Sequence, residues 1–406
     1  MSMPRFYFAI LVLVAGMYAC KELKVKTADN AIAIADSGGI RLQIVTNGIA
    51  QPVQMSIPTD SANRMFVTDH AGKIWMLKND SLLPQPFFNI AVEKSQNGTP
   101  SLLGTISSIA FHPQFATNHK FYVCYNTATS IKANPTKMVI DEFTEDIKKH
   151  DTTALKSGRR VFEMEGKMMY TNGAEIAFGP DGYLYISIGD DAFGDTSYVF
   201  HAQDLDYLNG KLLRIDVNKT PYAIPPDNPF IGMAHKRPEI WAYGFRKMWR
   251  FCFDPKSKQI YGGDVGENNR EEIDIITKAA NYGWPAMEGD TVFNQSTIAE
   301  QRSFTAPINT YSHKEGICVI SGNFYYGREI PFLQGKFVFG DFTTGIFTLY
   351  DTNGQWKRER VLVRNKLADP FLICAFDADR NNELYVMGLL NTRKGPKGVL
   401  YKIIKG

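Results

Sequence analysis

The 406-residue sequence has little net charge, few cysteines and little long helical periodicity. Its formal net charge is +3 and it has no dense run of Lys and Arg, so it lacks the basic footprint of a nucleic-acid-binding protein. The five cysteines form no CxxC motif and no His-paired spacing, which argues against a metal cluster. The scarcity of helical periodicity disfavours an α-helical fold.

What is present is typical of a globular β protein. Hydrophobic residues make up 44% of the chain and charged residues 21%, which is not the composition of a disordered chain. Aromatic residues reach 13%, and strands favour them, as do sites for sugars and flat cofactors. The chain is long, but closed β folds of this size occur as single units.

The N-terminus carries a predicted targeting signal. Arg5 precedes an apolar run over residues 6–15, and a short segment leads from there to Cys20. This order is typical of a secretory signal peptide, and the run is too short to span a bilayer easily. The cysteine resembles that of a bacterial lipobox, which predicts a lipid anchor on Cys20 and a membrane-bound periplasmic or cell-surface lipoprotein. Met17 and Tyr18 depart from the lipobox, so plain secretion is the alternative.

These signals divide the chain into a signal peptide at 1–19, a lipidated N-terminus and tether at 20–40, and a folded domain at 41–406. Four further cysteines each lie in an apolar, strand-like run: Cys124, Cys252, Cys318 and Cys374. Export would allow them to form disulfides, whereas free cysteine is an ordinary small core residue. The sequence leaves both possibilities open.

A strand–turn–strand pattern recurs along the domain. Each copy has an apolar strand, a turn rich in Pro, Asp, Gly and Asn, and a second apolar-aromatic strand, which is a hairpin signal. The copies lie at residues 55–67, 109–123, 176–186, 251–261, 321–339 and 374–386. A third strand of similar composition follows several copies, at 72–77, 210–215, 345–350 and 398–403.

Six units of about sixty residues predict an all-β fold, a six-bladed β-propeller of four-stranded antiparallel blades. The C-terminal strand is expected to share a blade with residues 42–45, which closes the ring and leaves no long edge bare. A two-sheet sandwich is the alternative. Residues 127–170 show no clear copy of the repeat, and their charged stretch at 141–156 is interpreted as an insertion.

Function in a propeller belongs to the loops at one mouth of the central channel. Motifs in these loops resemble the glucose/sorbosone dehydrogenase family: Asn172-Gly173, Gln203-Asp204-Leu205, and the stretches 178–186, 210–216, 224–230 and 239–246. Four further stretches are similar to the hedgehog-interacting-protein-like branch of that family: 249–250, 263–266, 271–274 and 281–284. The resemblance runs from about Gly48 to the C-terminus and rests on the order and number of the motifs.

The resemblance implies a propeller that binds pyrroloquinoline quinone (PQQ) and calcium, oxidises a sugar or related alcohol, and passes electrons to an external acceptor. PQQ has three carboxylates, which require fixed cations, above all arginine. A hard cation polarises the quinone carbonyl, and a base takes the proton of the substrate hydroxyl.

The resemblance also assigns site residues. Arg246 stands where the family has a cofactor-contacting arginine, and Lys247 replaces the usual asparagine beside it. Asn172 and Gln203 complete the predicted cofactor contacts, and a surface role is the alternative for Arg246.

Two calcium sites are implied. The backbone around Val265 and Gly266 matches the stretch that holds the active-site calcium, and Glu267 offers it a further hard oxygen. Near the position of a second, structural calcium the chain has Glu272, Tyr282 (through its carbonyl) and Glu288. A solvated strand residue is the alternative for Glu272.

The largest departure from the family is Thr171, which stands where active members have a histidine base. A threonine hydroxyl has no useful pKa near neutrality and cannot take the proton in the same way. The candidate replacements are His313 and His201, each of which is otherwise a polar loop histidine.

Three functional hypotheses follow. The first is a PQQ- and calcium-dependent oxidoreductase with a rebuilt base. The second is a non-catalytic propeller lipoprotein that binds a glycan or a protein partner, motivated by Thr171 and Lys247. The third is a metal-dependent hydrolase or lactonase that uses Asp190, Asp191 and Asn172.

Overall fold

The computed structural model describes residues 38–90, 104–128, 136–145, 156–166, 175–190, 199–294 and 303–406. The predicted signal peptide, tether and Cys20 lie outside these residues. No helix of the described part is long and apolar enough to cross a membrane.

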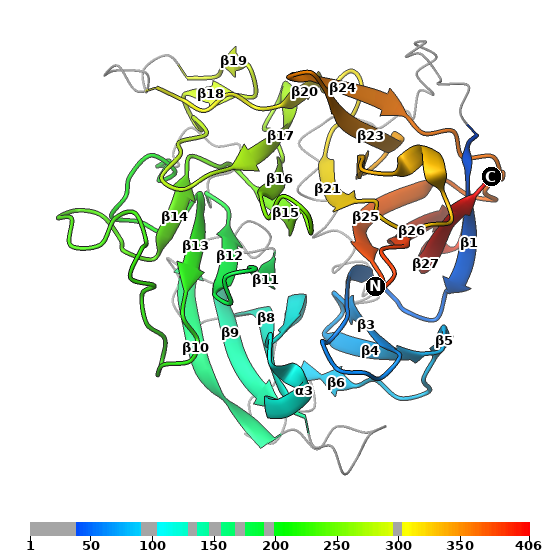
Figure 1. The fold of residues 1–406 in the computed structure, drawn as a ribbon, viewed down its shortest axis with the longest axis horizontal. Helices are drawn as coiled ribbons and strands as arrows, with labels where there is room; N and C mark the ends of the chain where they lie inside the picture. Colours follow the sequence, from blue (N-terminus) through cyan, green and yellow to red (C-terminus); the bar gives the residue numbers. More distant parts are fainter. Residues whose placement is uncertain are drawn as a thin grey trace, which may run out of the picture.

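The described residues form a six-bladed β-propeller, as the repeat predicted (Figure 1). Each blade is an antiparallel sheet whose first strand lies nearest the axis. Blade 1 has β2 (Pro52–Ser56), β3 (Arg64–Asp69) and β4 (Lys73–Lys78), with β5 (Ser81–Leu82) and β6 (Phe88–Asn89) both pairing β4. Blade 2 has β7 (Thr105–Phe111), β8 (Lys120–Ala128), β9 (Thr136–Thr144) and β10 (Lys156–Gly166). Blade 3 has β11 (Ile176–Phe178), β12 (Leu184–Ile188), β13 (Lys211–Ile215) and β14 (Ile240–Tyr243).

The other three blades repeat the plan. Blade 4 has β15 (Met248–Phe253), β16 (Ile260–Asp264), β17 (Arg270–Ile276) and β20 (Asn309–Ser312), with a small hairpin of β18 (Met287–Glu288) and β19 (Thr291–Val292) beside it. Blade 5 has β21 (Val319–Phe324), β22 (Phe337–Asp341), β23 (Gly345–Thr352) and β24 (Gln355–Arg360). Blade 6 has β25 (Phe371–Ala378), β26 (Leu384–Thr392), β27 (Gly395–Lys405) and β1 (Ile40–Thr46). The described residues also form two short helical turns, α3 (Phe115–Asn118) and η3 (Pro331–Leu333).

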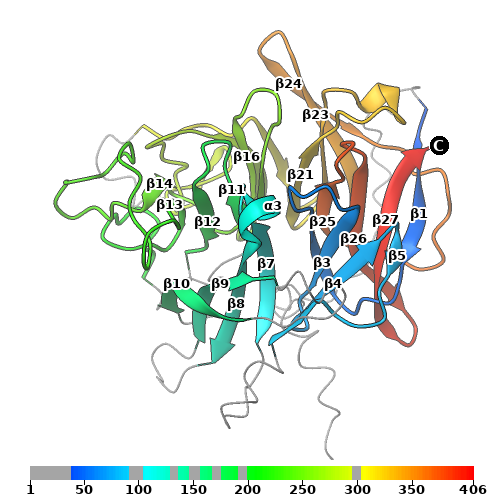
Figure 2. The same ribbon diagram turned by 60° about the horizontal axis from the view of Figure 1, so that its bottom comes forward.

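The ring closes as expected, because the first strand of the domain is the outermost strand of the last blade. β1 pairs antiparallel with β27, with Leu42 opposite Ile403, and the two strands lie side by side at the rim in both views (Figures 1 and 2). The sandwich alternative is therefore wrong. The interpretation of 141–156 as part of an insertion is also wrong at both ends, since β9 and β10 of blade 2 occupy much of 136–166.

Apolar and aromatic side chains fill the spaces between blades. Phe66 of blade 1 meets Phe111 of blade 2, with ring centroids 4.8 Å apart. Every residue of β12 and β13 is buried, because neighbouring blades cover both faces of that sheet. The four cysteines outside the N-terminal segment are free thiols, three of them buried, which matches the core interpretation rather than the disulfide one.

The channel through the ring has two ends, which we name by the chain segments that form them. The end that we call the upper mouth is formed by the segments that lead into β15 and β21, together with the β3–β4 and β16–β17 turns. The end that we call the lower mouth is formed by the carboxyl ends of the six inner strands, and it is the end that faces upward in Figure 2, where α3 lies. The candidate active site is at the upper mouth.

Candidate active site at the upper mouth

Arg246 and Lys247 come directly before the inner strand β15, and one carboxylate fixes both of them. Asp264, at the end of β16, accepts the backbone N–H of Arg246 at 2.8 Å and that of Lys247 at 2.5 Å. Burial raises the pKa of Asp264 to about 6. The preceding Gly244 has φ +87°, and a Cβ there would lie 2.4 Å from Asn281 Oδ1, so this tight approach requires glycine.

The Arg246 side chain is already paired within the chain. Its Nε donates to Glu267 Oε2 at 2.7 Å, Nη2 donates to the same oxygen, and Nη1 donates to the Val265 carbonyl at 2.8 Å. The Arg246 and Glu267 side chains are only 10% and 13% exposed. The guanidinium therefore interacts with two of the oxygens that the sequence offered to a calcium ion.

Lys247 and His70 add nitrogen groups to the same mouth. The Lys247 ammonium lies 5.5 Å from the Trp249 ring, and burial lowers its pKa to about 8. His70, in the β3–β4 turn, has its pKa lowered to about 4, first by burial and also by the charges of Arg250 and Lys247. Its Nδ1 lies 3.1 Å from the Ile106 carbonyl, which only accepts, so Nδ1 carries the proton and Nε2 has a lone pair.

Sequence reasoning missed His70. The available signal was its position in the first tight turn between a second and a third strand, at Asp69-His70-Ala71-Gly72.

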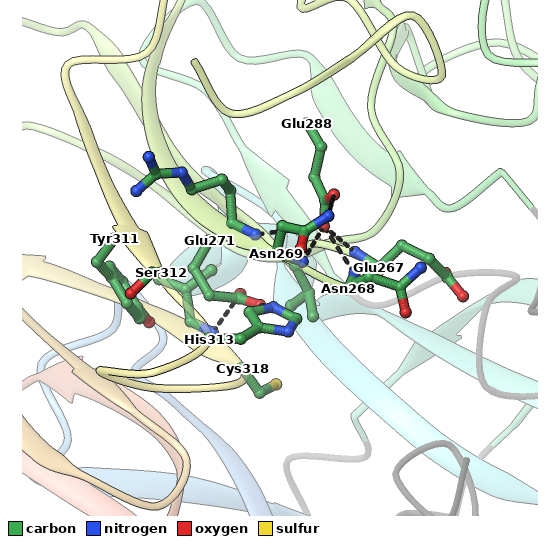
Figure 3. A network of polar contacts seen from close by, with 12 residues as sticks. Glu267, Asn268, Asn269, Glu271, Glu288, Tyr311, Ser312, His313 and Cys318 are labelled. Carbon is green, nitrogen blue, oxygen red and sulfur yellow. Dashed lines mark hydrogen bonds and ion pairs between the residues drawn. The ribbon is translucent and has the colours of Figure 1, made fainter. Parts of the chain in front are cut away.

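His313 forms a close pair with a buried carboxylate. Its Nε2 lies 2.7 Å from Glu271 Oε1, while Glu271 Oε2 accepts the Val319 N–H at 2.8 Å (Figure 3). Burial raises the pKa of the Glu271 carboxyl to about 7. Burial also favours the neutral imidazole, but the hydrogen bond and charge of Glu271 outweigh it and raise the pKa of His313. The positive charge of Arg246 opposes this rise in the pKa of His313.

Glu288 holds the β16–β17 turn. Its Oε1 accepts the backbone N–H groups of Glu267, Asn268, Asn269 and Arg270 at 2.7, 2.8, 2.9 and 3.3 Å (Figure 3). Burial alone would raise the pKa of Glu288, but these amides lower it. A Cβ at Gly266 would lie 1.8 Å from the Arg270 carbonyl oxygen, so the turn also needs glycine there. Glu288 thus positions the segment that carries Glu267.

Three carboxyl groups gather below this turn. Glu272 pairs with Asp264 across β16 and β17, and Asp274 follows on the same face of β17. Burial, and then the neighbouring carboxylates, raise the pKa of both Glu272 and Asp274 well above the usual range. Neither carboxyl oxygen of Asp274 has a hydrogen-bond partner in the described structure. A hard cation would stabilise such a group, although no three acidic, His or Cys groups of the described residues surround one point.

Tyr282 and Gln203 are structural in their visible contacts. The Tyr282 hydroxyl donates to the Ile275 carbonyl at 2.7 Å, and its ring stacks on Phe245. Gln203 and Asn281 exchange amide hydrogen bonds, each at 2.8 Å, and Gln203 also donates to the Trp284 carbonyl at 2.8 Å. Gln203 therefore ties the β12–β13 loop to the segment that packs beside Arg246.

Of the remaining predicted residues, the structure describes Asp190 and His201. Asp190 accepts the His201 N–H at 2.8 Å and Trp284 Nε1 at 2.9 Å, and the His201 ring stacks on Tyr207. Thr171, Asn172 and Asp191 lie outside the described residues. The structure thus brings Arg246, Val265, Glu267, Glu288 and His313 to one mouth and links Gln203 to it through Trp284.

Comparison with known proteins identifies the family. Residues 49–370 match the Glucose / Sorbosone dehydrogenase family. The HIPL2 protein of Arabidopsis thaliana is 30% identical over 72% of this chain and 51% of its own length, and human Hedgehog-interacting protein is 24% identical over 89% and 52%. The chain spans about half the length of these curated relatives.

A solved structure agrees on the fold. The PQQ-bound form of aldose sugar dehydrogenase from Streptomyces coelicolor superposes with a TM-score of 0.66 at 20% identity, covering 91% of this chain and all of that one. The family match covers most of the propeller, from blade 1 to the start of blade 6. The chain belongs to the glucose/sorbosone dehydrogenase family.

Proposed function

We propose that this protein is a PQQ-dependent oxidoreductase that oxidises a sugar or related alcohol at the upper mouth. Family membership supports the reaction class. The observation that carries the proposal for this chain is the His313–Glu271 pair, which lies at the same mouth as Arg246 and Lys247. It offers a base in a protein that lacks the family histidine at position 171.

The cations of the mouth fit a tricarboxylate. Arg246 and Lys247 are adjacent, and Trp249 and Trp284 lie beside their charges. The Arg246 and Lys247 side chains would hold carboxylates of PQQ, and Glu267 would compete with PQQ for Arg246. When bound, the quinone supplies the two-electron acceptor.

His313 is suited to remove the substrate proton. Because Glu271 accepts at Nε2, the neutral imidazole keeps its lone pair on Nδ1. A substrate hydroxyl that reaches Nδ1 would lose its proton there, and Glu271 would stabilise the imidazolium that forms. The Val319 N–H holds the second Glu271 oxygen, so the ring keeps one orientation.

Calcium is the second part of the proposal. The unpartnered Asp274 and its neighbour Glu272 support a structural calcium in blade 4. An active-site calcium at the Val265 and Gly266 backbone and Glu267 would have to displace the Arg246 guanidinium from its present partners.

We also propose that Cys20 carries a lipid anchor, that the protein is exported to the periplasm or cell surface, and that it passes electrons to an external acceptor.

The second candidate function is a non-catalytic propeller that binds a glycan or a protein. The Arg246–Glu267 pair favours it, because an arginine that is already neutralised is a weaker site for an anionic cofactor. Thr171 points the same way. The hydrolase hypothesis gains nothing from Asp190, since both of its oxygens accept hydrogen bonds within the chain.

The experiment is a titration of metal-stripped protein with PQQ, with and without calcium, followed by absorbance and calorimetry. Saturable, calcium-dependent binding that Arg246→Ala weakens is expected, followed by dye-coupled oxidation of an aldose. Absence of PQQ binding at every calcium concentration would reject the oxidoreductase and leave the binding propeller.

A further inference from the structure

A second cavity lies at the lower mouth, at the opposite end of the channel from Arg246. Its volume is about 450 Å³, within the range of small-molecule sites. Residues from all six inner strands line it, namely β2, β7, β11, β15, β21 and β25. The cavity therefore lies on the axis of the ring, and the proposed reaction at the upper mouth does not use it.

Buried cross-blade contacts form the floor of this cavity. Gln54 Nε2 donates to Glu175 Oε1 at 3.3 Å, and Glu175 Oε2 accepts the Phe251 N–H at 3.0 Å. Arg250 donates to the carbonyls of Ser107, at 3.2 Å, and Val53. These side chains come from β2, β15 and the segment before β11, so the floor joins three blades across the axis.

Three residues that line the cavity from blades 5 and 6 each have a side-chain oxygen without a hydrogen-bond partner among the described residues. Ser321 is 1% exposed, lines the cavity, and its Oγ has no hydrogen-bond partner in the described structure. Asn323 donates from Nδ2 to the Phe376 carbonyl at 2.9 Å, which leaves its Oδ1 without a partner among the described residues. Asp377 accepts the Met55 N–H on Oδ2 at 2.7 Å, and its Oδ1 is likewise unmatched there. A buried hydroxyl without a partner is costly, and a ligand that donates would relieve it.

The buried charges of the cavity do not balance. Among the described lining residues, Arg250 is one cation facing two carboxyl groups, Glu175 and Asp377. At the rim, Asp254 and the exposed Lys258 offset each other. Burial raises the pKa of both Glu175 and Asp377, because the carboxylates are removed from water without enough positive charge beside them. A bound monocation would balance the second carboxylate.

We propose that the lower-mouth cavity binds a small primary ammonium ligand. An R–NH₃⁺ group has three N–H donors, and Asp377, Ser321 and Asn323 present three acceptor oxygens. The rest of the ligand contacts the apolar walls, where the aromatic rings also attract a cation. The phenylalanines that line the cavity are Phe111, Phe178, Phe251, Phe253 and Phe376. A neutral polyol would satisfy the hydroxyl but not the charge.

Calorimetric titration of the purified protein with n-butylammonium chloride at pH 7 tests the proposal. We expect saturable binding of the amine, and affinities at least about tenfold lower for n-butanol and xylitol, which lack the charge. Asp377→Asn should weaken amine binding by about tenfold or more, since it removes a charge-assisted hydrogen bond. Ser321→Ala gives a second, smaller reduction and serves if Asp377→Asn does not fold by circular dichroism.

Arg246→Ala is the matched control at the other mouth and should leave amine affinity unchanged. The proposal is overturned by an absence of saturable binding, by equal binding of n-butanol or xylitol, or by unaltered affinity in the folded lower-mouth variants. Loss of binding in Arg246→Ala would place the amine at the upper mouth and would equally overturn it.

Discussion

Arg246 and Glu267 form an ion pair in which Nε and Oε2 are 2.7 Å apart and both side chains are close to nine-tenths buried. The pair joins the segment before β15 to the β16–β17 turn, and Glu288 holds the Glu267 N–H from the other side. Any carboxylate ligand of Arg246 must compete with this internal partner.

Glu267→Gln should raise the affinity for PQQ by about tenfold or more, because the guanidinium is freed from a charged partner. Titration by absorbance at fixed calcium measures the effect. Glu163→Gln, in an exposed ion pair on blade 2, is the matched control and should change nothing. Weaker PQQ binding by Glu267→Gln would instead assign Glu267 to the calcium ion.

Glu271→Gln should move the acidic limb of the pH profile of kcat/KM to lower pH. The charge of Glu271 raises the pKa of His313, and the imidazole must be neutral to accept a proton. Without that charge the pKa of His313 falls, so the base is active at lower pH but weaker, and kcat decreases. His313→Gln should lower kcat by about 10²-fold or more. An unmoved limb in Glu271→Gln would exclude His313 as the base.

Calcium should stabilise the wild-type protein and have little effect on Asp274→Asn. The Asp274 carboxyl is buried without hydrogen-bond partners in the described structure, so a cation that binds it raises the melting temperature. Thermal unfolding with calcium and with chelator measures the difference. Asp351→Asn, at the exposed end of β23, is the control. Equal calcium stabilisation of wild type and Asp274→Asn would place the ion elsewhere.

The stability of the metal-free protein should fall as the pH rises from about 4 to about 6. The pKa of Asp264 in the folded protein is about 6, above its unfolded value, so the folded state binds more protons in this window. Denaturant unfolding at each pH measures it. Asp264→Asn should flatten this part of the curve, and an unchanged slope in that variant would contradict the assignment.

Glu288→Ala should loosen the β16–β17 turn. It removes the acceptor of four backbone N–H groups and should cost about 1–3 kcal/mol of stability. Amide hydrogen exchange at residues 267–270 should accelerate by more than in the rest of blade 4. Uniform acceleration across the blade would indicate global destabilisation rather than a local role.

Local pattern was enough to predict the blades, and distance along the chain explains what it missed. Each hairpin is encoded by neighbouring residues, such as the Gly179–Gly182 turn between β11 and β12, so the repeat predicted the fold and its closure. The pairing of His313 with Glu271 joins residues 42 positions apart, and that of Gln203 with Asn281 joins residues 78 apart. A sequence pattern of a few residues cannot predict such long-range contacts, so the partners of the site residues are known only from the folded structure. The strands β9 and β10 were not predicted because each has two adjacent charged residues, Asp141-Glu142 and Arg159-Arg160, within its apolar pattern.

The pairing of β1 with β27 closes the ring by joining the first and the last strand of the domain. During synthesis, β1 can pair with β27 only after residues 400–405 have been made, so blade 6 gains its outer strand at the end of the chain. This pairing joins residues about 360 positions apart, so it is a slow and entropically costly step. Once it has formed, it stabilises all six blades. Loss of either strand would therefore destabilise the whole ring and not blade 6 alone.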